Sequence, residues 1–362
     1  MQDKVDVSII VPVYNGEKHI KNCIDVIKNQ DFLGTFEVLI VNDASNDNTV
    51  NIIQKLNIEN LEIYSLKVNS GQSEARNFGI KKAVGDYIFF IDVDDTIEKN
   101  TLTILFDKAK ETNSDFVCAD FKRIENLKNQ RDGKYNYSQD MLFNHKEIIS
   151  AMHTELHDPT LGHLGLFGCN GRLIRRSILI NNKIFFEKKL RWLEDKTFCW
   201  DVLSYINKAI YIKKQLYSYY VYPNVKTAIT ESLINGFPFS YIKLINKHIK
   251  QSLLQRKVSE KNIELLSQQG LIFHSIQILV SISRSMALGK IDLKKGKEIR
   301  KVLIKEIFND IDVKKAIKNY IPSNKESVWI PRAIALRSIY FLEFTCDLRA
   351  RQVIKKRRKG KE

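Results

Sequence analysis

Three carboxylates stand close together after an apolar run: Asp92, Asp94 and Asp95 follow Tyr-Ile-Phe-Phe-Ile at positions 87–91. Such a run is typical of a strand that is buried on both faces of a parallel sheet. Open α/β sheets bind ligands at the carboxyl ends of their strands. Clustered carboxylates repel one another, and their oxygens suit Mg²⁺ or Mn²⁺. We therefore expect a metal site here; the alternative is that Asp94 or Asp95 caps the helix that begins near Lys99.

A second acidic pair, Glu194 and Asp195, is flanked by aromatic residues and opens an apolar helix. One interpretation is an acidic first turn that complements the helix dipole. The other is general-base chemistry, because transfer of a group to an alcohol needs a carboxylate that accepts the hydroxyl proton. The two interpretations assign the same residues either to folding or to catalysis.

The elements that must position these acids follow a regular order. Apolar runs at 7–13, 36–41, 61–65 and 87–91 alternate with segments whose apolar residues recur at helical spacing. This alternation predicts an α/β fold with a mainly parallel sheet between helices. Neither a G-x-G-x-x-G after the first strand nor a G-x-x-x-x-G-K-[ST] is present, so a glycine-rich phosphate loop is not expected. Without such a loop, a metal ion held by carboxylates is the simplest way for this site to bind phosphates.

The sequence resembles glycosyltransferase family 2, whose members are inverting enzymes of the GT-A fold. The resemblance is carried by four segments in the family's order, at residues 7–15, 41–45, 69–79 and 87–95. It is clear over residues 5–115 and weaker over 160–225. Family members usually carry two aspartates at the end of the second strand, where this chain has Asn42 and Asp43.

The resemblance implies a binding site for a nucleoside-diphosphate sugar. The residues implied to contact this donor are Pro12, Tyr14, Asn15, Asp43, Arg76, Asp92, Val93 and Asp94. Residues 92–94 would be the D-x-D motif, with Asp94 the direct metal ligand, Asp92 part of the same metal site and Asp95 close by. Mn²⁺ or Mg²⁺ would be the cofactor.

The chemistry of the side chains agrees with these implied roles. Tyr14 can stack on a base, Asp43 can accept from a base or a ribose hydroxyl, and Arg76 can offset diphosphate charge. Structural alternatives remain open. Asp43 or Ser45 could cap the next helix, and Arg76 could pair with a nearby acid, either Glu74 or Asp43.

The resemblance also implies an acceptor site in the second half of the catalytic domain. Asp195 matches the family's general base, and Glu194 matches the residue before it. Trp192 would stack on a sugar face, and Asn170 or Arg172 would bind the acceptor. The implied reaction is a single displacement that inverts the anomeric centre.

The chain is predicted to contain two domains. Residues 1–224 would form the GT-A catalytic domain, with a nucleotide-sugar half at about 1–115 and an acceptor half at about 116–224. Residues 225–362 would form a basic, helical domain that ends in a single helix starting at Pro331. The longest uncharged apolar stretch, 270–283, is expected to be too short and too polar to span a bilayer.

Composition narrows the choice of partners. The chain has 362 residues, 44% of them hydrophobic, and a formal net charge of +16. This charge suggests an anionic partner, but no motif that reads nucleic acid is recognisable, so none is expected to bind. The basic C-terminal helices favour an anionic membrane surface, with a contact in a homo-oligomer as the alternative. The five cysteines are scattered, which is typical of reduced thiols in the cytoplasm.

Together these observations predict a metal-dependent, inverting glycosyltransferase. Its donor would be a nucleoside-diphosphate sugar, by family habit a UDP-sugar, and its acceptor a glycan or a lipid-linked hydroxyl. It would act in cell-surface polysaccharide synthesis, in the cytoplasm, at the inner face of the plasma membrane. The alternatives are a sugar-nucleotide nucleotidyltransferase and a basic nucleic-acid-binding module.

Overall fold

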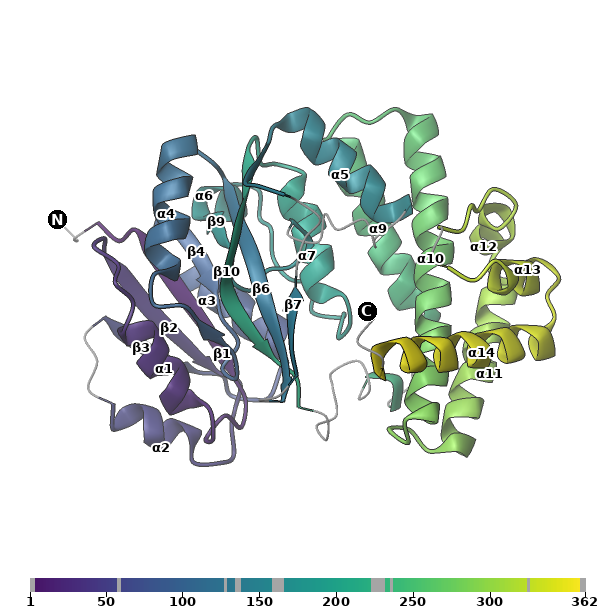
Figure 1. Cartoon of the computed structure of the whole chain (residues 1–362), viewed down its shortest axis with the longest axis horizontal. Helices are drawn as coiled ribbons and strands as arrows, with labels where there is room; N and C mark the ends of the chain where they lie inside the picture. Colours follow the sequence, from purple (N-terminus) through teal and green to yellow (C-terminus); the bar gives the residue numbers. More distant parts are fainter. Residues whose placement is uncertain are drawn as a thin grey trace. The chain divides into compact units, whose positions relative to one another are not determined.

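The computed structural model describes residues 4–56, 60–126, 129–133, 138–157, 166–222, 232–234, 237–323 and 326–358 (Figure 1). The chain divides into two compact units. Unit 1 contains Met1–Ala151 and Gly162–Asn224, and unit 2 contains Met152–Leu161 and Val225–Glu362. The described part of unit 1 is built on a β-sheet, and the described part of unit 2 is helical.

The strands that the structure describes form one mixed sheet of ten strands. Its order is β3-β2-β1-β4-β9-β6-β10-β5, with β7 beside β6 and β8 beside β10. The bounds are β1 Val7–Val13, β2 Phe36–Asn42, β3 Leu61–Ser65, β4 Tyr87–Phe90, β5 Thr96–Ile97, β6 Phe116–Asn126, β7 Asn129–Gly133, β8 Met141–Phe143, β9 Leu173–Arg175 and β10 Ala209–Tyr220. The four strands predicted in the first hundred residues are present and parallel, which confirms the predicted α/β sheet.

The register of the sheet gathers the predicted site residues. Val13 at the end of β1 lies opposite Asn42 of β2, and Ile10 lies opposite Phe90 of β4. The carboxyl ends of β1, β2 and β4 therefore meet at one edge of the sheet, which we call the carboxyl edge. The segments that begin at Tyr14 and at Asp92 both leave the sheet there.

Helices cover both faces of this sheet (Figure 1). The helices described up to residue 203 are α1 Ile20–Lys28, α2 Thr49–Gln54, α3 Gln72–Lys82, α4 Thr101–Thr112, α5 His145–His157, α6 Arg176–Asn181 and α7 Glu194–Leu203, of which α5 runs from unit 1 into unit 2. On one face, α1 buries apolar side chains spaced as i, i+3, i+4 and i+7, namely Ile20, Cys23, Ile24 and Ile27. On the other face, α3 approaches β1 closely, since a Cβ on Gly79 would lie 2.5 Å from Ile10 Cγ2.

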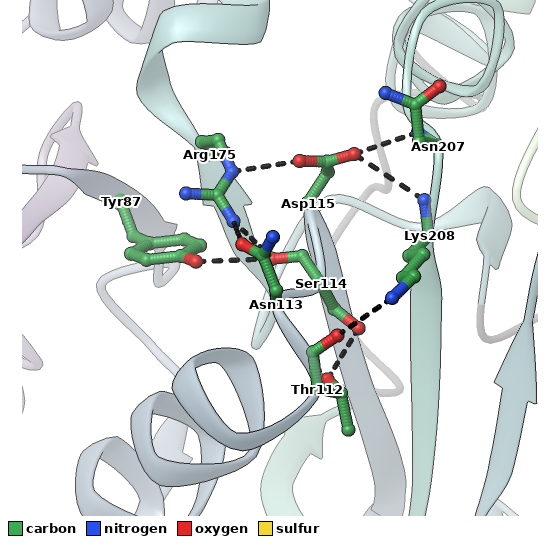
Figure 2. A network of polar contacts seen from close by, with 8 residues as sticks. All are labelled: Tyr87, Thr112, Asn113, Ser114, Asp115, Arg175, Asn207 and Lys208. Carbon is green, nitrogen blue, oxygen red and sulfur yellow. Dashed lines mark hydrogen bonds and ion pairs between the residues drawn. The ribbon is translucent and has the colours of Figure 1, made fainter.

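A polar network closes the opposite edge of the sheet, where β4, β6 and β10 begin (Figure 2). We call it the amino-edge network. Asp115 accepts hydrogen bonds from Arg175 Nε at 2.8 Å and from the backbone N–H groups of Asn207 and Lys208 at 2.7 and 3.4 Å. The other members are Tyr87, Thr112, Asn113 and Ser114. The network ties the end of β9 to the starts of β6 and β10.

The helices of unit 2 surround one long helix, as the loss of strand patterns after residue 224 predicts. The bounds are α9 Phe239–Gln255, α10 Glu260–Ala287, α11 Leu293–Asn309, α12 Ile311–Ala316, α13 Trp329–Ala335 and α14 Ile339–Arg358. α10 contacts each of the other five. Among the described residues it is the one helix long and apolar enough to cross a membrane, with mean hydropathy 1.3. It extends the apolar stretch 270–283 in both directions, and 72% of the window is buried inside the structure, as in a core helix.

The end of the chain differs from the prediction of one helix starting at Pro331. Pro331 lies in the first turn of α13, which ends at Ala335, and α14 starts afresh at Ile339. Between them Arg337 has a φ of 53°, a left-handed conformation that interrupts the helix. The apolar residues before and after the break therefore belong to two helices.

Candidate active site

The loops that follow β1 and β2 are joined to each other by hydrogen bonds. The backbone N–H of Asn15 donates to Ser45 Oγ at 2.9 Å, and the N–H of Asn46 donates to Asn15 Oδ1 at 2.9 Å. Tyr14 is held beside this junction with 48% of its surface exposed. Pro12 is buried within β1, opposite Val41. An aromatic ring is thus presented at the carboxyl edge on a fixed loop.

Asp43 binds the loop that leads into α3. Its two carboxylate oxygens accept from the N–H groups of Ser70 and Gly71 at 2.7 and 2.8 Å. The next helix, α2, has Asn48 at its N-cap and no side-chain cap there, so neither Asp43 nor Ser45 caps it. A carboxylate has lone pairs for further donors, and Asp43 remains able to accept from a ligand.

Asn42 stands where family members usually carry an aspartate. Its Oδ1 accepts from the N–H of Ser45 at 3.0 Å, and its Nδ2 donates to Ser65 Oγ at 3.1 Å. The first bond holds the turn that follows β2, and the second joins the end of β2 to the end of β3. Asn42 therefore serves the local structure of the loop.

Asp92 is held by side chains from two distant segments. Its Oδ1 accepts from Arg76 Nη2 at 2.8 Å and from Gln72 Nε2 at 2.8 Å, both on α3. Its Oδ2 accepts from Asn170 Nδ2 at 2.7 Å. Charge-assisted bonds of this kind are stronger than neutral ones, so the Asp92 carboxylate has a fixed orientation. Arg76 pairs with Asp92 and with neither of the acids named as alternatives, Glu74 and Asp43.

Asp95 is buried and held by β10. Tyr217 Oη donates to its Oδ2 at 2.5 Å, and the N–H of Tyr220 donates to its Oδ1 at 2.9 Å. Burial and repulsion by Asp92 raise the pKa of Asp95 to about 8, although the hydrogen bonds from β10 oppose this shift. Gly171 makes room for Tyr217: it has a φ of +67°, and a Cβ there would lie 2.5 Å from Tyr217 Cδ2.

Asp94 differs from its two neighbours. Within the described residues, its side chain has no hydrogen bond or ion pair to another residue, and Asn100 rather than Asp94 or Asp95 is at the N-cap of α4. Burial and repulsion by Asp92 raise the pKa of Asp94, while His19 opposes the shift. Val93 packs on the loop after β1, since a Cβ on Gly16 would lie 3.3 Å from its Cγ2. Asp94 is thus the carboxylate of the three that is left available.

Glu194 and Asp195 open α7 and lie within the electrostatic reach of Arg76 and Asp92. Asp195 Oδ1 accepts from the N–H of Lys196 at 2.6 Å. Burial, followed by repulsion from Asp195, raises the pKa of Glu194 to about 7. Burial also raises the pKa of Asp195, and Arg76 opposes this shift. Two acidic clusters that are a hundred positions apart in sequence therefore share one arginine.

Arg76 is the centre of this arrangement. Only 2% of its side chain is exposed, and its guanidinium lies over the ring of Phe186 with 5.2 Å to the centroid. Nη2 also donates to Asn170 Oδ1 at 3.3 Å. Nε and Nη1 are buried without a hydrogen-bond partner in the part of the chain that the structure describes. Unpaired buried donors are costly, so these two nitrogens call for a partner, which a ligand at this edge would supply.

The comparison with known families decides the assignment. A model of "Glycosyl transferase family 2" matches residues 8–213, more than half of the chain. The chain belongs to glycosyl transferase family 2. The resemblance that was carried by four sequence segments is thereby confirmed.

Two curated relatives from Staphylococcus aureus are similar to the family 2 region. Poly(ribitol-phosphate) beta-N-acetylglucosaminyltransferase TarS is 30% identical over 215 residues, which is 59% of this chain and 35% of TarS. The enzyme of the same description named TarP is 29% identical over 223 residues, 60% of this chain and 63% of TarP. The matched region thus spans about a third of the length of TarS and under two thirds of TarP.

A solved structure confirms the fold. The crystal structure of S. aureus TarS 1–349 in complex with UDP-GlcNAc superposes with a TM-score of 0.69 and 21% sequence identity. The match covers 96% of this chain and 92% of that one, so it includes the helices after residue 224. The predicted GT-A fold with a helical C-terminal region is confirmed.

The predicted metal ligands of the family 2 site are not equivalent. Over the described ranges, no three His, Cys, Asp or Glu side chains form a group that could hold a metal ion by themselves. Asp92 and Asp95 are engaged by protein donors, whereas Asp94 is not. A metal ion here would depend on Asp94 and on oxygens supplied by a substrate, as is usual for Mg²⁺.

The predicted acceptor residues are divided in the same way. Trp192 is half-buried two positions before Glu194. Asn170 bonds to Asp92 and Arg76, and the buried Arg172 donates through Nη1 to the carbonyl of Asn170 at 2.7 Å. The contacts of Asn170 and Arg172 thus support the carboxyl edge, and their predicted role toward an acceptor stays a prediction.

Sequence reasoning missed two residues of the site, Gln72 and Tyr217, and predicted a different role for a third, Asn170. Gln72 and Asn170 hold the carboxylate of Asp92, and Tyr217 holds that of Asp95. Gln72 opens the helix that also carries Arg76, and this spacing was the one available signal. No spacing in the sequence connects Tyr217 with Asp95, because their contact depends on how β10 lies in the sheet.

Proposed function

We propose that this chain is a metal-dependent, inverting glycosyltransferase that uses a nucleoside-diphosphate sugar, a UDP-sugar in the first instance. The acceptor would be a hydroxyl group of a glycan or a lipid-linked molecule in cell-surface polysaccharide synthesis. The observation that carries the proposal is the meeting of two acidic clusters at Arg76, with Asp92 at 2.8 Å and with Glu194 and Asp195 within its field. The names of TarS and TarP, which act on poly(ribitol-phosphate), support an acceptor of the polysaccharide class.

The carboxyl edge offers contacts for each part of such a donor. The exposed ring of Tyr14 suits stacking on the base, and Asp43 suits a hydrogen bond from the base or ribose. The unpaired Nε and Nη1 of Arg76 suit the anionic diphosphate. Binding of the donor would satisfy these buried donors, and this gain would contribute to affinity.

The residues present fit a divalent cation. Within the described part of the chain, the Asp94 side chain has no partner residue, and it lies beside the fixed Asp92. The mutual repulsion of these two carboxylates, which helps to raise the pKa of Asp94, would be relieved by a cation. Bound Mn²⁺ or Mg²⁺ would act as a Lewis acid that stabilises negative charge on the leaving diphosphate. Asp94 would hold it, with Asp92 and Asp95 in the surrounding polar shell.

Asp195 would act as the general base. As the acceptor oxygen forms its bond to the anomeric carbon, the hydroxyl proton passes to the Asp195 carboxylate. The bond between the anomeric carbon and the diphosphate oxygen breaks, and the nucleoside diphosphate leaves with the electron pair. Attack on the face opposite the leaving group inverts the anomeric centre, through an oxocarbenium-like transition state of the kind seen in glycosidases.

The two alternative functions have less support. A nucleotidyltransferase would need an activating lysine in a glycine-rich first loop, whereas the loop after β1 is fastened to residues 45–46. A nucleic-acid-binding module rests on charge alone. We further propose that the enzyme works in the cytoplasm at the inner face of the plasma membrane, which the basic C-terminal helices favour.

A screen of nucleotide sugars tests the proposal. Thermal stabilisation and donor hydrolysis are measured with and without Mn²⁺ or Mg²⁺. One class of nucleoside diphosphate should stabilise the protein in the presence of metal, and Asp94→Ala should abolish this effect. Asp107→Ala, which removes an exposed carboxylate of α4, is the matched control and should bind as the wild type does. Stabilisation of Asp94→Ala equal to that of the wild type would contradict the metal assignment.

A further inference from the structure

The C-terminal helices of unit 2 expose a row of large apolar side chains. We call it the α13–α14 face. Its members, with their exposed fractions, are Trp329 (51%), Leu336 (71%), Tyr340 (87%), Phe344 (64%) and Leu348 (44%). Single exposed apolar residues are ordinary, but a contiguous set usually marks a surface that another partner covers.

The geometry of α14 places these residues on one side of the helix. Tyr340, Phe344 and Leu348 are four positions apart, so they lie above one another. The opposite side of α14 is fully buried at Leu342 and Cys346, and α14 packs against α10. Among the described residues, unit 2 thus buries one side of α14 and leaves the apolar residues of the other side exposed.

α13 continues the same surface. The rings of Trp329 and Phe341 are 6.4 Å apart, which places Trp329 of α13 next to α14. Arg332 lies over the Trp329 ring with 4.9 Å to its centroid. Indole and phenol side chains in an exposed apolar row are typical of a surface that sits at a water–lipid boundary.

Basic and acidic residues of α14 lie in different positions relative to the face. Beyond Leu348 the exposed side of α14 continues with Arg351 and Lys355, which follow at helical steps of three and four. The acidic residues of α14 that neighbour the face, Glu343 and Asp347, both pair with the buried Arg300 of α11. Arg300 therefore offsets part of their negative charge from inside the unit, while the exposed side beyond Leu348 continues with basic residues.

We propose that the α13–α14 face docks on an anionic lipid surface. The apolar side chains would enter the boundary between headgroups and acyl chains, while Arg351 and Lys355 would bind anionic headgroups. A second copy of the chain is a poorer partner, because parallel pairing of two such faces would bring basic residues of like charge together, and antiparallel pairing would set Arg351 and Lys355 against apolar residues. The proposal makes the proposed membrane location specific, and its test uses no substrate, so its failure would leave the proposed transfer reaction untouched.

Sedimentation of the full chain with lipid vesicles tests this surface. We expect binding to vesicles that contain phosphatidylglycerol, little binding to phosphatidylcholine alone, and weaker binding as salt rises. The double variant Tyr340→Ser with Phe344→Ser, and separately Arg351→Glu with Lys355→Glu, should each weaken binding by about tenfold or more. A matched control, Val302→Ser with Lys301→Glu, changes exposed residues of α11 and should bind as the wild type does.

Two results would overturn the proposal. One is binding of both face variants at wild-type strength while their melting temperatures show them to be folded. The other is a wild-type dimer in light scattering that Phe344→Ser dissociates, together with no vesicle binding, which would assign the face to a second copy of the chain. Loss of binding in the face variants, with retention in the α11 control, would support lipid docking.

Discussion

Two arginine–aspartate pairs at opposite edges of one sheet have the same local geometry and different surroundings. Arg76 binds Asp92 at the carboxyl edge, and Arg175 binds Asp115 in the amino-edge network, both at 2.8 Å. Each guanidinium lies over an aromatic ring, with 5.2 Å to the centroid for Arg76 and 5.0 Å for Arg175. The geometry of the two pairs does not by itself show which edge of the sheet carries the function.

The difference lies in what each arginine leaves unpaired. Arg175 is 28% exposed and donates to Asp115, Asn113 and the carbonyl of Ser114 (Figure 2). Arg76 is 2% exposed, yet two of its nitrogens have no partner among the described residues. An unpaired buried donor costs roughly 1–3 kcal/mol, so a site that keeps two of them sacrifices stability. Of these two networks, the one around Arg175 fits a role in folding, and the one around Arg76 keeps donors that a ligand would satisfy.

The largest expected effect comes from Asp195→Asn. Transfer should fall by about 10²–10⁴-fold, because the variant cannot accept the hydroxyl proton, while metal-dependent donor binding is kept. The counterpart at the other edge, Asp115→Asn, should lower the free energy of unfolding by about 2 kcal/mol and leave kcat per folded molecule near the wild-type value. Kinetics with the donor from the screen, and denaturant melts, measure the two quantities. A normal kcat in Asp195→Asn would remove the base assignment.

Exchange of the two arginines for methionine is expected to have the next largest effect. Arg76→Met leaves Asp92, Glu194 and Asp195 without their shared counter-charge, so donor binding and turnover should fall by about 100-fold or more. Arg175→Met should instead cost about 2 kcal/mol of stability with activity within about twofold of the wild type. Calorimetric donor titrations and melting curves separate the two outcomes. Equal losses of activity in both variants would contradict the claim that only the carboxyl edge takes part in the reaction.

Glu194→Gln should change how stability depends on pH. The pKa of Glu194 is raised to about 7 by burial and by Asp195, against the opposing charge of Arg76. Between the unfolded value near 4.5 and this value, the folded protein binds more protons than the unfolded chain, so stability falls as pH rises through this window. The variant should therefore be more stable than the wild type by about 2 kcal/mol near pH 8, and the gain should shrink toward pH 5. Melts at both pH values measure this, and a gain of the same size at each would refute the explanation.

Tyr217→Phe is expected to have the smallest effect. β10 serves both edges: the residues before it bind Asp115, and Tyr217 near its end donates to Asp95. Loss of that hydroxyl should cost about 1 kcal/mol and lower kcat a few-fold, chiefly through a less fixed Asp94 next to Asp95. Tyr219→Phe, on an exposed tyrosine two positions later, is the matched control. Identical kcat values for both variants and the wild type would limit Tyr217 to a packing role.

The sequence predicted the part of the site that local patterns determine. A buried run that ends in acids placed Asp92, Asp94 and Asp95 at a strand end, and parallel pairing brought Tyr14 and Asp43 to the same edge. Glu194 and Asp195 were candidates because they form an acidic pair between aromatic residues and because they match the family, but nothing near them in sequence points to Arg76. The spacing of residue types predicts the helix or strand to which a residue belongs. It does not predict which residue of another strand or helix it will contact.

The remaining differences have the same origin. Asn170 was expected to face an acceptor, but it meets Asp92 because it bridges Phe90 just before β9, a strand too short for a period to be recognised. The break between α13 and α14 lies at Arg337, where no glycine signals the left-handed turn. Both features are set by tertiary packing.

The position of β9 makes the nucleotide-binding half dependent on the rest of the fold. β9 lies antiparallel between β4 and β6, so it supplies the hydrogen-bond partners along one side of β4. A fragment that stops near residue 115 would leave the backbone groups along that side of β4 unpaired and its apolar side chains exposed. Such an unpaired strand edge is a template for aggregation. Residue 115 is therefore a poor place to split this enzyme, and equally poor as the junction of a chimera that exchanges the donor-binding half. A junction has to keep β4 and β9 on the same fragment.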